Sequence, residues 1–259
     1  MEDLITRLSE AADPRVIDWP FMNDPSFVLV IIVVYLILVL KIGPAFMENR
    51  KAYSLNKFMF YYNITAVIAS AAISYGLLTS GWTTTLTLGC EPATHSLDPE
   101  PLRMAKFVWW TMILKIFELT DTFIFVLRKK KNQTSFLHIY HHAMVVLIAW
   151  IGTRWAAGGM WTLNIITNCM VHVMMYMYYL LASFGPKIQN VISPWKPYLT
   201  IIQMLQFLFM LIHMCQALLP SCEPTRKPIA YIYLSQVIVV FYLFWEFYKK
   251  SYLKKNKSL

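Results

Sequence analysis

The chain has 259 residues, of which 58% are hydrophobic and 14% charged, and its mean hydropathy is +0.49. This composition is too apolar for an ordinary soluble domain and indicates a membrane protein. The formal net charge of +9 is therefore interpreted as a signal of membrane topology, and we expect no nucleic-acid partner.

Seven long apolar segments follow one another along the chain. They are residues 27–46, 58–79, 107–127, 136–152, 158–184, 198–219 and 229–248. Each approaches the roughly 20 residues that a helix needs to cross a ~30 Å hydrocarbon core. Short loops separate them, and we detect no internal repeat. The sequence predicts an all-α integral membrane protein with seven transmembrane helices in a single domain, residues 1–259.

The basic residues gather at one end of the predicted spans. Fifteen of the 23 lysines and arginines lie in one set of loops, and seven lie in the opposite set. Because positive charge accumulates on the cytosolic side, we expect a cytosolic C-terminus and a lumenal N-terminus. The final residues, KNKSL, place Lys255 and Lys257 as in a dilysine retrieval signal of the endoplasmic reticulum. A tail that merely follows the charge bias is an equally good interpretation.

Polar residues recur at helical spacing in four of the spans. They are Lys115, Glu118, Asp121 and Thr122, then His138, His141 and His142, then Asn164, Asn168, His172 and Tyr176, and finally Gln203 and Gln206. A rise of about 1.5 Å per residue places them between the cytosolic side and the middle of the membrane. Ionisable groups at that depth are expected to face inward. The sequence thus predicts a polar pocket inside the bundle, with the first span at its periphery.

Some of these residues also have purely structural interpretations. Lys115 and Glu118 could form an ion pair that fixes the register of the helices. Gln203 and Gln206 could provide hydrogen bonds between helices. Neither interpretation excludes an active site nearby.

The segment SFLHIYHHAMVV, residues 135–146, contains three of the six histidines. His138, His141 and His142 lie at positions i, i+3 and i+4, on one face of a helix. Imidazoles ligate iron in membrane desaturases and hydroxylases, although those di-iron enzymes carry more histidines than this chain has. Alternatively, a neutral imidazole can attack a thioester to form an acyl-imidazole while a second histidine moves protons. The residues alone leave both chemistries open.

Four ordered blocks carry a resemblance to a known family. They are KIFELTDT (115–122), RKKKNQTSFLHIYHH (128–142), NCMVHVMMYMYY (168–179) and TIIQMLQF (200–207). In this order and spacing they resemble the signature blocks of the very-long-chain fatty-acid elongase family. The resemblance extends over essentially the whole chain.

The resemblance implies a 3-oxoacyl-CoA synthase of the endoplasmic-reticulum membrane, which condenses a long-chain acyl-CoA with malonyl-CoA. It implies six helices in an inverted barrel around a substrate tunnel, plus one peripheral N-terminal helix. Apart from the two CoA substrates, it implies no cofactor and no metal. Membrane lipid, a second copy of the chain and the other enzymes of the elongation cycle are the partners that it suggests.

The resemblance also implies roles for individual residues. His141 would be the nucleophile that takes up the acyl group, and His172 would assist proton transfer or activate malonyl-CoA. His138 and His142 would orient the site, while Asn168 would donate a hydrogen bond to an oxyanion. The residues that would line or brace the pocket are Lys115, Glu118, Asp121, Tyr176, Gln203 and Gln206. The residues that suit the CoA phosphates, or simply follow the charge bias, are Arg128, Lys129, Lys130 and Lys131.

Seven spans also occur in receptors and transporters. A polar pocket that opens to the cytosol argues against a receptor, and the lack of a detectable repeat argues against a transporter. Release of carbon dioxide from labelled malonyl-CoA in the presence of acyl-CoA would separate the three classes.

The four cysteines divide by position. Cys90 and Cys222 lie in predicted lumenal loops, whereas Cys169 and Cys215 lie within spans. An oxidising lumen favours a bridge between the two loop thiols. We expect a Cys90–Cys222 disulfide that stabilises the fold by about 2–4 kcal/mol.

Overall fold

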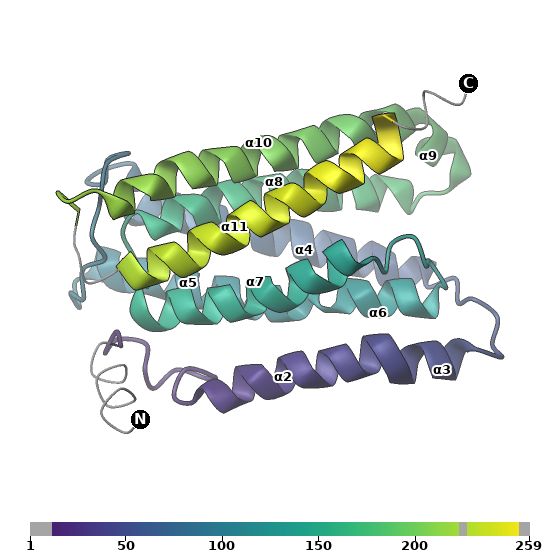
Figure 1. Cartoon of the computed structure of the whole chain (residues 1–259), viewed down its shortest axis with the longest axis horizontal. Coiled ribbons are helices and arrows are strands. Elements are labelled where there is room, and N and C mark those ends of the chain that lie inside the picture. The colour runs from purple at the N-terminus through teal and green to yellow at the C-terminus, as the bar shows by residue number, and fades with distance from the viewer. Residues whose placement is uncertain (1–11, 223–226, 254–259) are drawn as a thin grey trace.

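The computed structural model describes residues 12–222 and 227–253, and every regular element within these ranges is helical. The long helices run side by side in one elongated bundle (Figure 1). Six helices of the described ranges are long and apolar enough to cross a membrane, as expected for an integral membrane protein. They are Pro25–Met47, Asn56–Trp82, Phe136–Trp155, Trp161–Ala182, Pro186–Leu218 and Lys227–Leu253. These six coincide with six of the seven predicted spans.

Several of these helices are composite. The α-helical segments are α2 (Pro25–Ile37), α3 (Gly43–Met47), α4 (Asn56–Leu77), α5 (Pro99–Glu118), α6 (Thr120–Leu127), α7 (Phe136–Trp155), α8 (Trp161–Ala182), α9 (Pro186–Ile192), α10 (Lys196–Cys215) and α11 (Lys227–Tyr248). Turns of π-helix join α2 to α3 and extend α4 to Trp82 and α11 to Leu253. Short 3₁₀ turns flank α10 at both ends.

The third predicted span differs from the other six. The structure begins this helix at Pro99 instead of residue 107 and interrupts it at Leu119, between α5 and α6. Lys115, Glu118 and Asp121 lie around this break and are all buried. α5 ends at the break and carries five charged residues, which are Glu100, Arg103, Lys106, Lys115 and Glu118. It is not among the described helices that could span a membrane by length and composition. Seven spans were expected, and six helices of the described residues meet this criterion.

Local capping sets where the histidine-bearing helix begins. The Ser135 hydroxyl accepts a hydrogen bond from the His138 backbone N–H at 3.3 Å, which satisfies one of the unpaired donors of a helix N-terminus. As a result α7 begins at Phe136, and His138, His141 and His142 occupy its first two turns.

Six helices contact one another pairwise and form a closed ring. α4 packs against α8 and α5, α5 against α7, α7 against α11, α11 against α10, and α10 against α8. α2 packs on α7 from outside this ring and exposes Val30, Val33 and Val34. Figure 1 shows α2 and α3 along one edge of the bundle. The first span is therefore peripheral, as its lack of a polar face predicts.

One end of the bundle is tied together by covalent and polar contacts. Cys90 and Cys222 form a disulfide with a Cα separation of 5.8 Å. The buried Arg15 guanidinium pairs with Asp13 at 2.6 Å and donates to the Ala157 carbonyl at 3.1 Å. Gly159 has a φ of +63°, and a Cβ there would approach the Glu91 carbonyl oxygen to 2.5 Å. The loops before α5 and α8 and the N-terminal segment are thereby held against each other.

Removing the disulfide should destabilise this end of the bundle. The bridge joins residues 132 positions apart, so Cys90→Ser with Cys222→Ser should lower the free energy of unfolding by about 2–5 kcal/mol. Thermal unfolding of the purified protein in detergent measures the change. Cys215→Ser is the matched control, because Cys215 is an exposed free thiol. Equal melting temperatures for all three proteins, or free Cys90 and Cys222 in peptide maps of native membranes, would contradict the bridge.

Candidate active site

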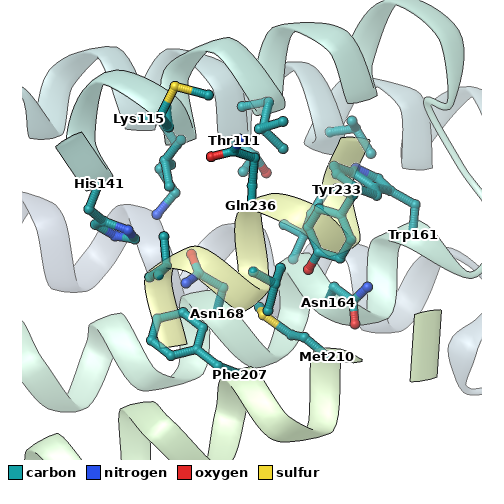
Figure 2. Close-up of a pocket in the computed structure, with 18 residues that line it drawn as sticks. Thr111, Lys115, His141, Trp161, Asn164, Asn168, Phe207, Met210, Tyr233 and Gln236 are labelled. Atoms are coloured by element: carbon teal, nitrogen blue, oxygen red, sulfur yellow. The ribbon is translucent and has the colours of Figure 1, made fainter. Parts of the chain in front are cut away.

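A cavity opens among five of the helices that form the ring. It comprises about 780 Å³ of space between α5, α7, α8, α10 and α11, part of it open to solvent, and most of its lining is apolar. The polar lining residues are Thr111, Lys115, His141, Asn164, Asn168 and Gln236. Figure 2 shows Lys115, His141 and Asn168 gathered at one end of the cavity, and Trp161 and Tyr233 at the other. The cavity therefore has a polar end and an aromatic end.

A buried carboxylate organises the polar end. The Glu118 side chain on α5 accepts hydrogen bonds from the Lys115 ammonium at 3.0 and 3.3 Å. The same carboxylate lies 3.0 Å from Nδ1 of His172 on α8. Lys115 and Glu118 are only 4% and 2% exposed, so the ion pair is almost wholly removed from solvent. The ion pair lies within α5, and the contact of Glu118 with His172 links α5 to α8.

Contact with a carboxylate selects the tautomer of His172. Nδ1 of His172 lies 3.0 Å from the Glu118 carboxylate and 3.4 Å from the Lys115 ammonium. Because an ionised carboxylate only accepts hydrogen bonds, the shorter contact favours the tautomer with the proton on Nδ1. Nε2 is then the basic nitrogen of the ring. A carboxylate that orients an imidazole in this way is the arrangement expected of a proton acceptor in acid–base chemistry.

A second buried carboxylate braces the first. Asp121 on α6 accepts a hydrogen bond from the Tyr176 hydroxyl at 2.7 Å. The Tyr176 ring packs edge-on against His172, with centroids 5.8 Å apart, and against Tyr62 of α4 at 6.0 Å. Neither His172 nor Asp121 nor Tyr176 lines the cavity. Asp121 and Tyr176 support the His172 ring.

The three clustered histidines have different surroundings. Nε2 of His138 lies 3.0 Å from the Thr122 hydroxyl, which lies 2.8 Å from the hydroxyl of Tyr35 on the peripheral α2. The His138 and His142 rings pack against each other with centroids 4.3 Å apart. His141 alone of the three lines the cavity, and its buried Nδ1 has no hydrogen-bond partner. The cluster thus consists of one ring that faces the cavity and two that support it.

The structure leaves several predicted site residues outside the cavity. The Gln206 amide contacts the Met210 sulfur at 3.4 Å and the Gln203 amide contacts the Met175 sulfur at 3.6 Å, so neither lines the cavity as its helical face suggested. The basic residues that follow α6 are Arg128, Lys129, Lys130 and Lys131, and none of them lines the cavity. These residues follow the last turn of α6, a position that is compatible with binding at the mouth of the cavity.

Sequence reasoning missed one polar pair in the cavity wall. The Tyr140 hydroxyl donates to the Gln236 side-chain oxygen at 2.5 Å and thereby joins α7 to α11. Gln236 was detectable in principle, because it is the single carboxamide in the last predicted span. Thr111 was hidden, since a threonine in an apolar helix carries no comparable signal.

The three clustered histidines of α7 contact other rings and, in the case of His138, a hydroxyl group. Among residues 12–222 and 227–253, no three His, Cys, Asp or Glu side chains converge where they could hold one metal ion. The His141 ring packs edge-on against Phe207 and Phe244, with centroids 6.5 and 6.1 Å away.

Comparison with known proteins decides the family. The model of the GNS1/SUR4 (ELO) family matches residues 20–259. The chain belongs to this family. It is 39% identical to very long chain fatty acid elongase 1 of Mus musculus over 256 residues, 98% of this chain and 91% of that protein. It is 37% identical to very long chain fatty acid elongase 7 of Drosophila melanogaster, over 96% of this chain and 75% of that protein. The resemblance drawn from the four sequence blocks is confirmed.

The buried ion pair generates a test of stability. Lys115→Met or Glu118→Gln alone leaves one charge buried without its partner, which typically costs about 3–5 kcal/mol. The double variant should recover part of that loss, since it removes both charges. Thermal unfolding of the wild type, the two single variants and the double variant in detergent gives the interaction energy between Lys115 and Glu118.

Glu246→Gln is the matched control for this cycle. Glu246 pairs with Lys249 at a partly exposed site, where an ion pair contributes about 0–1 kcal/mol. A double variant as unstable as the sum of the two single variants would show that Lys115 and Glu118 do not stabilise each other.

Proposed function

We propose that the protein condenses a long-chain acyl-CoA with malonyl-CoA to give a 3-oxoacyl-CoA, carbon dioxide and CoA. One observation carries the proposal: His141 faces an otherwise apolar cavity whose polar end also holds Lys115 and Asn168 (Figure 2). An apolar slot suits an acyl chain, and an imidazole at its polar end suits a thioester carbonyl. The relatives named as very long chain fatty acid elongases support the same class of substrate.

In the first step of the proposed reaction, an imidazole nitrogen of His141 attacks the thioester carbon. The carbon–sulfur bond breaks, the imidazole loses its proton, and CoA leaves as the thiol. Asn168 donates a hydrogen bond to the oxyanion that forms on the carbonyl oxygen. The apolar lining limits hydrolysis of the acyl-imidazole, because it keeps water scarce around it.

In the second step, malonyl-CoA loses carbon dioxide, and the electrons of the broken carbon–carbon bond form an enolate. The enolate carbon attacks the acyl carbon, the carbon–nitrogen bond to His141 breaks, and the imidazole regains a proton. His172, held by Glu118, moves the proton, while the Lys115 ammonium stabilises negative charge. The overall reaction consumes one proton and requires no further cofactor.

The arrangement of helices supports a tunnel for the acyl chain. In our proposal the ring of α4, α5, α7, α11, α10 and α8 is an inverted barrel around the substrate, with α5 and α6 as the seventh membrane crossing. α2 and α3 stay outside it. The CoA part of the substrate would then lie at the end where the basic residues that follow α6 gather.

Replacement of His141 tests the covalent step. Given acyl-CoA without malonyl-CoA, the wild-type protein should release free CoA and gain the mass of the acyl group on His141. His141→Ala should do neither, because it lacks the nucleophile. Peptide mass spectrometry and a thiol assay measure the two products. His138→Ala is a useful comparison, since its ring supports the cluster outside the cavity and should reduce acylation without moving the adduct.

Two results would contradict this mechanism. An acyl adduct on a residue other than His141 would reassign the nucleophile. Full turnover by His141→Ala would remove the covalent step altogether.

We further propose residence in the endoplasmic reticulum, with the N-terminus lumenal and the C-terminus cytosolic. The tail KNKSL lies outside the described residues, so the proposal rests on the distribution of basic residues in the sequence. Protease added to intact microsomes should digest a C-terminal tag but spare the loop of residues 83–98. Protection of the tag would reverse the orientation and place the polar end of the cavity toward the lumen.

A further inference from the structure

A second cavity lies beyond the aromatic end of the first. It holds about 480 Å³ of empty space, and both Cys90 and Cys222 line it. Trp161, the first residue of α8, lines both cavities. The second cavity therefore lies on the far side of the indole from His141, at the end of the bundle that the disulfide ties together.

The Trp161 indole is held in place on two sides. It is buried and packs edge-on against Tyr233 of α11, with ring centroids 4.6 Å apart. On the α7 side it lies over Gly152, where an added Cβ would approach the indole to 2.5 Å. The ring fills the space that a side chain at position 152 would need. The indole is thus a fixed wall between the two cavities, and its position depends on the absence of a side chain at Gly152.

The spacing along α8 sets the length of the first cavity. Trp161 lies seven residues before Asn168, which lines the polar end of the cavity, a distance of about 10 Å along a helix that rises ~1.5 Å per residue. That is about a third of the ~30 Å hydrocarbon core of a bilayer. Figure 2 shows His141 and Trp161 at opposite ends of the cavity.

We propose that Trp161 sets the upper limit of acyl-chain length by walling off the second cavity. The inference rests on the proposed condensing activity and names the residue that limits its substrates. An acyl chain bound at His141 extends toward the aromatic end and stops at the indole. The second cavity beyond it can receive further carbons only when the indole is removed.

A graded series at position 161 tests the wall. Trp161→Phe, Trp161→Leu and Trp161→Ala remove increasing volume, and each purified protein is given acyl-CoAs of rising length with malonyl-CoA. Mass spectrometry of the 3-oxoacyl-CoA products gives the longest chain that each variant accepts. That limit should rise along the series. The rate on the first acyl-CoA beyond the wild-type limit, relative to a short substrate, should rise by about tenfold or more, since even one methylene in an apolar pocket is worth 10–200-fold.

Filling the second cavity supplies the matched control. Ala217 is buried and lines only the second cavity of the two. Ala217→Leu alone should leave the product lengths unchanged, because the chain of the wild-type enzyme does not reach it. In the Trp161→Ala background, Ala217→Leu should shorten the products again. A mutation that merely loosened the fold would not be reversed in this way.

The outcomes separate this inference from the proposed function. Wild-type protein that makes no 3-oxoacyl-CoA from any acyl-CoA would overturn the condensing activity. Wild-type protein that condenses normally, with an unchanged length limit in Trp161→Leu and Trp161→Ala, would overturn the role of Trp161 alone. If Trp161→Ala does not accumulate as folded protein, Trp161→Leu decides the question, because it retains an apolar side chain in the wall.

Discussion

The Glu118 carboxylate, buried between Lys115 and His172, is the constraint around which the bundle is organised. An unpaired carboxylate at this depth would cost several kcal/mol, so both of its partners must lie within hydrogen-bonding distance in the folded state. Lys115 is on the same helix and His172 is on another, at 3.0 Å from the carboxylate. The pair therefore fixes α5 against α8 and, with them, the position and tautomer of the imidazole. Together with Glu100, Arg103 and Lys106, these two charges make α5 more polar than the six helices that could span a membrane by length and composition.

The sequence predicted correctly the direction of those side chains whose exposure to lipid would cost free energy. Lys115, Glu118 and His172 were predicted to face inward because an ionisable side chain that faces lipid is energetically unfavourable. The three side chains meet in the structure. The histidine spacing likewise placed three rings on one face of α7. That spacing could not show which of the three rings lines the cavity. Helical periodicity tells which side of a helix a side chain is on, but not how far it reaches into the bundle. Only tertiary packing shows that one ring reaches the cavity while Thr122 and Tyr35 engage another.

Other features depended on contacts that no local pattern encodes. Gln203 and Gln206 repeat at helical spacing, yet their amides contact methionine sulfurs instead of the cavity. Gln236 lies on a helix with no polar face, yet it lines the cavity and accepts a hydrogen bond from Tyr140. Trp161 looks from the sequence like one more aromatic residue at the end of a span. Its place between two cavities follows from the loop before α8, where Gly159 lies against the segment that carries Cys90.

The close approach of Gly152 and Trp161 has an evolutionary consequence. A side chain at position 152 would occupy the volume that the indole now fills, so neither position is free to change independently of the other. An alanine or larger residue at 152 is compatible with the present backbone only if position 161 carries a smaller side chain. Conversely, a small residue at 161 removes the reason for glycine at 152. The two positions should therefore covary among members of the family, with the larger side chain on one helix or the other but not on both.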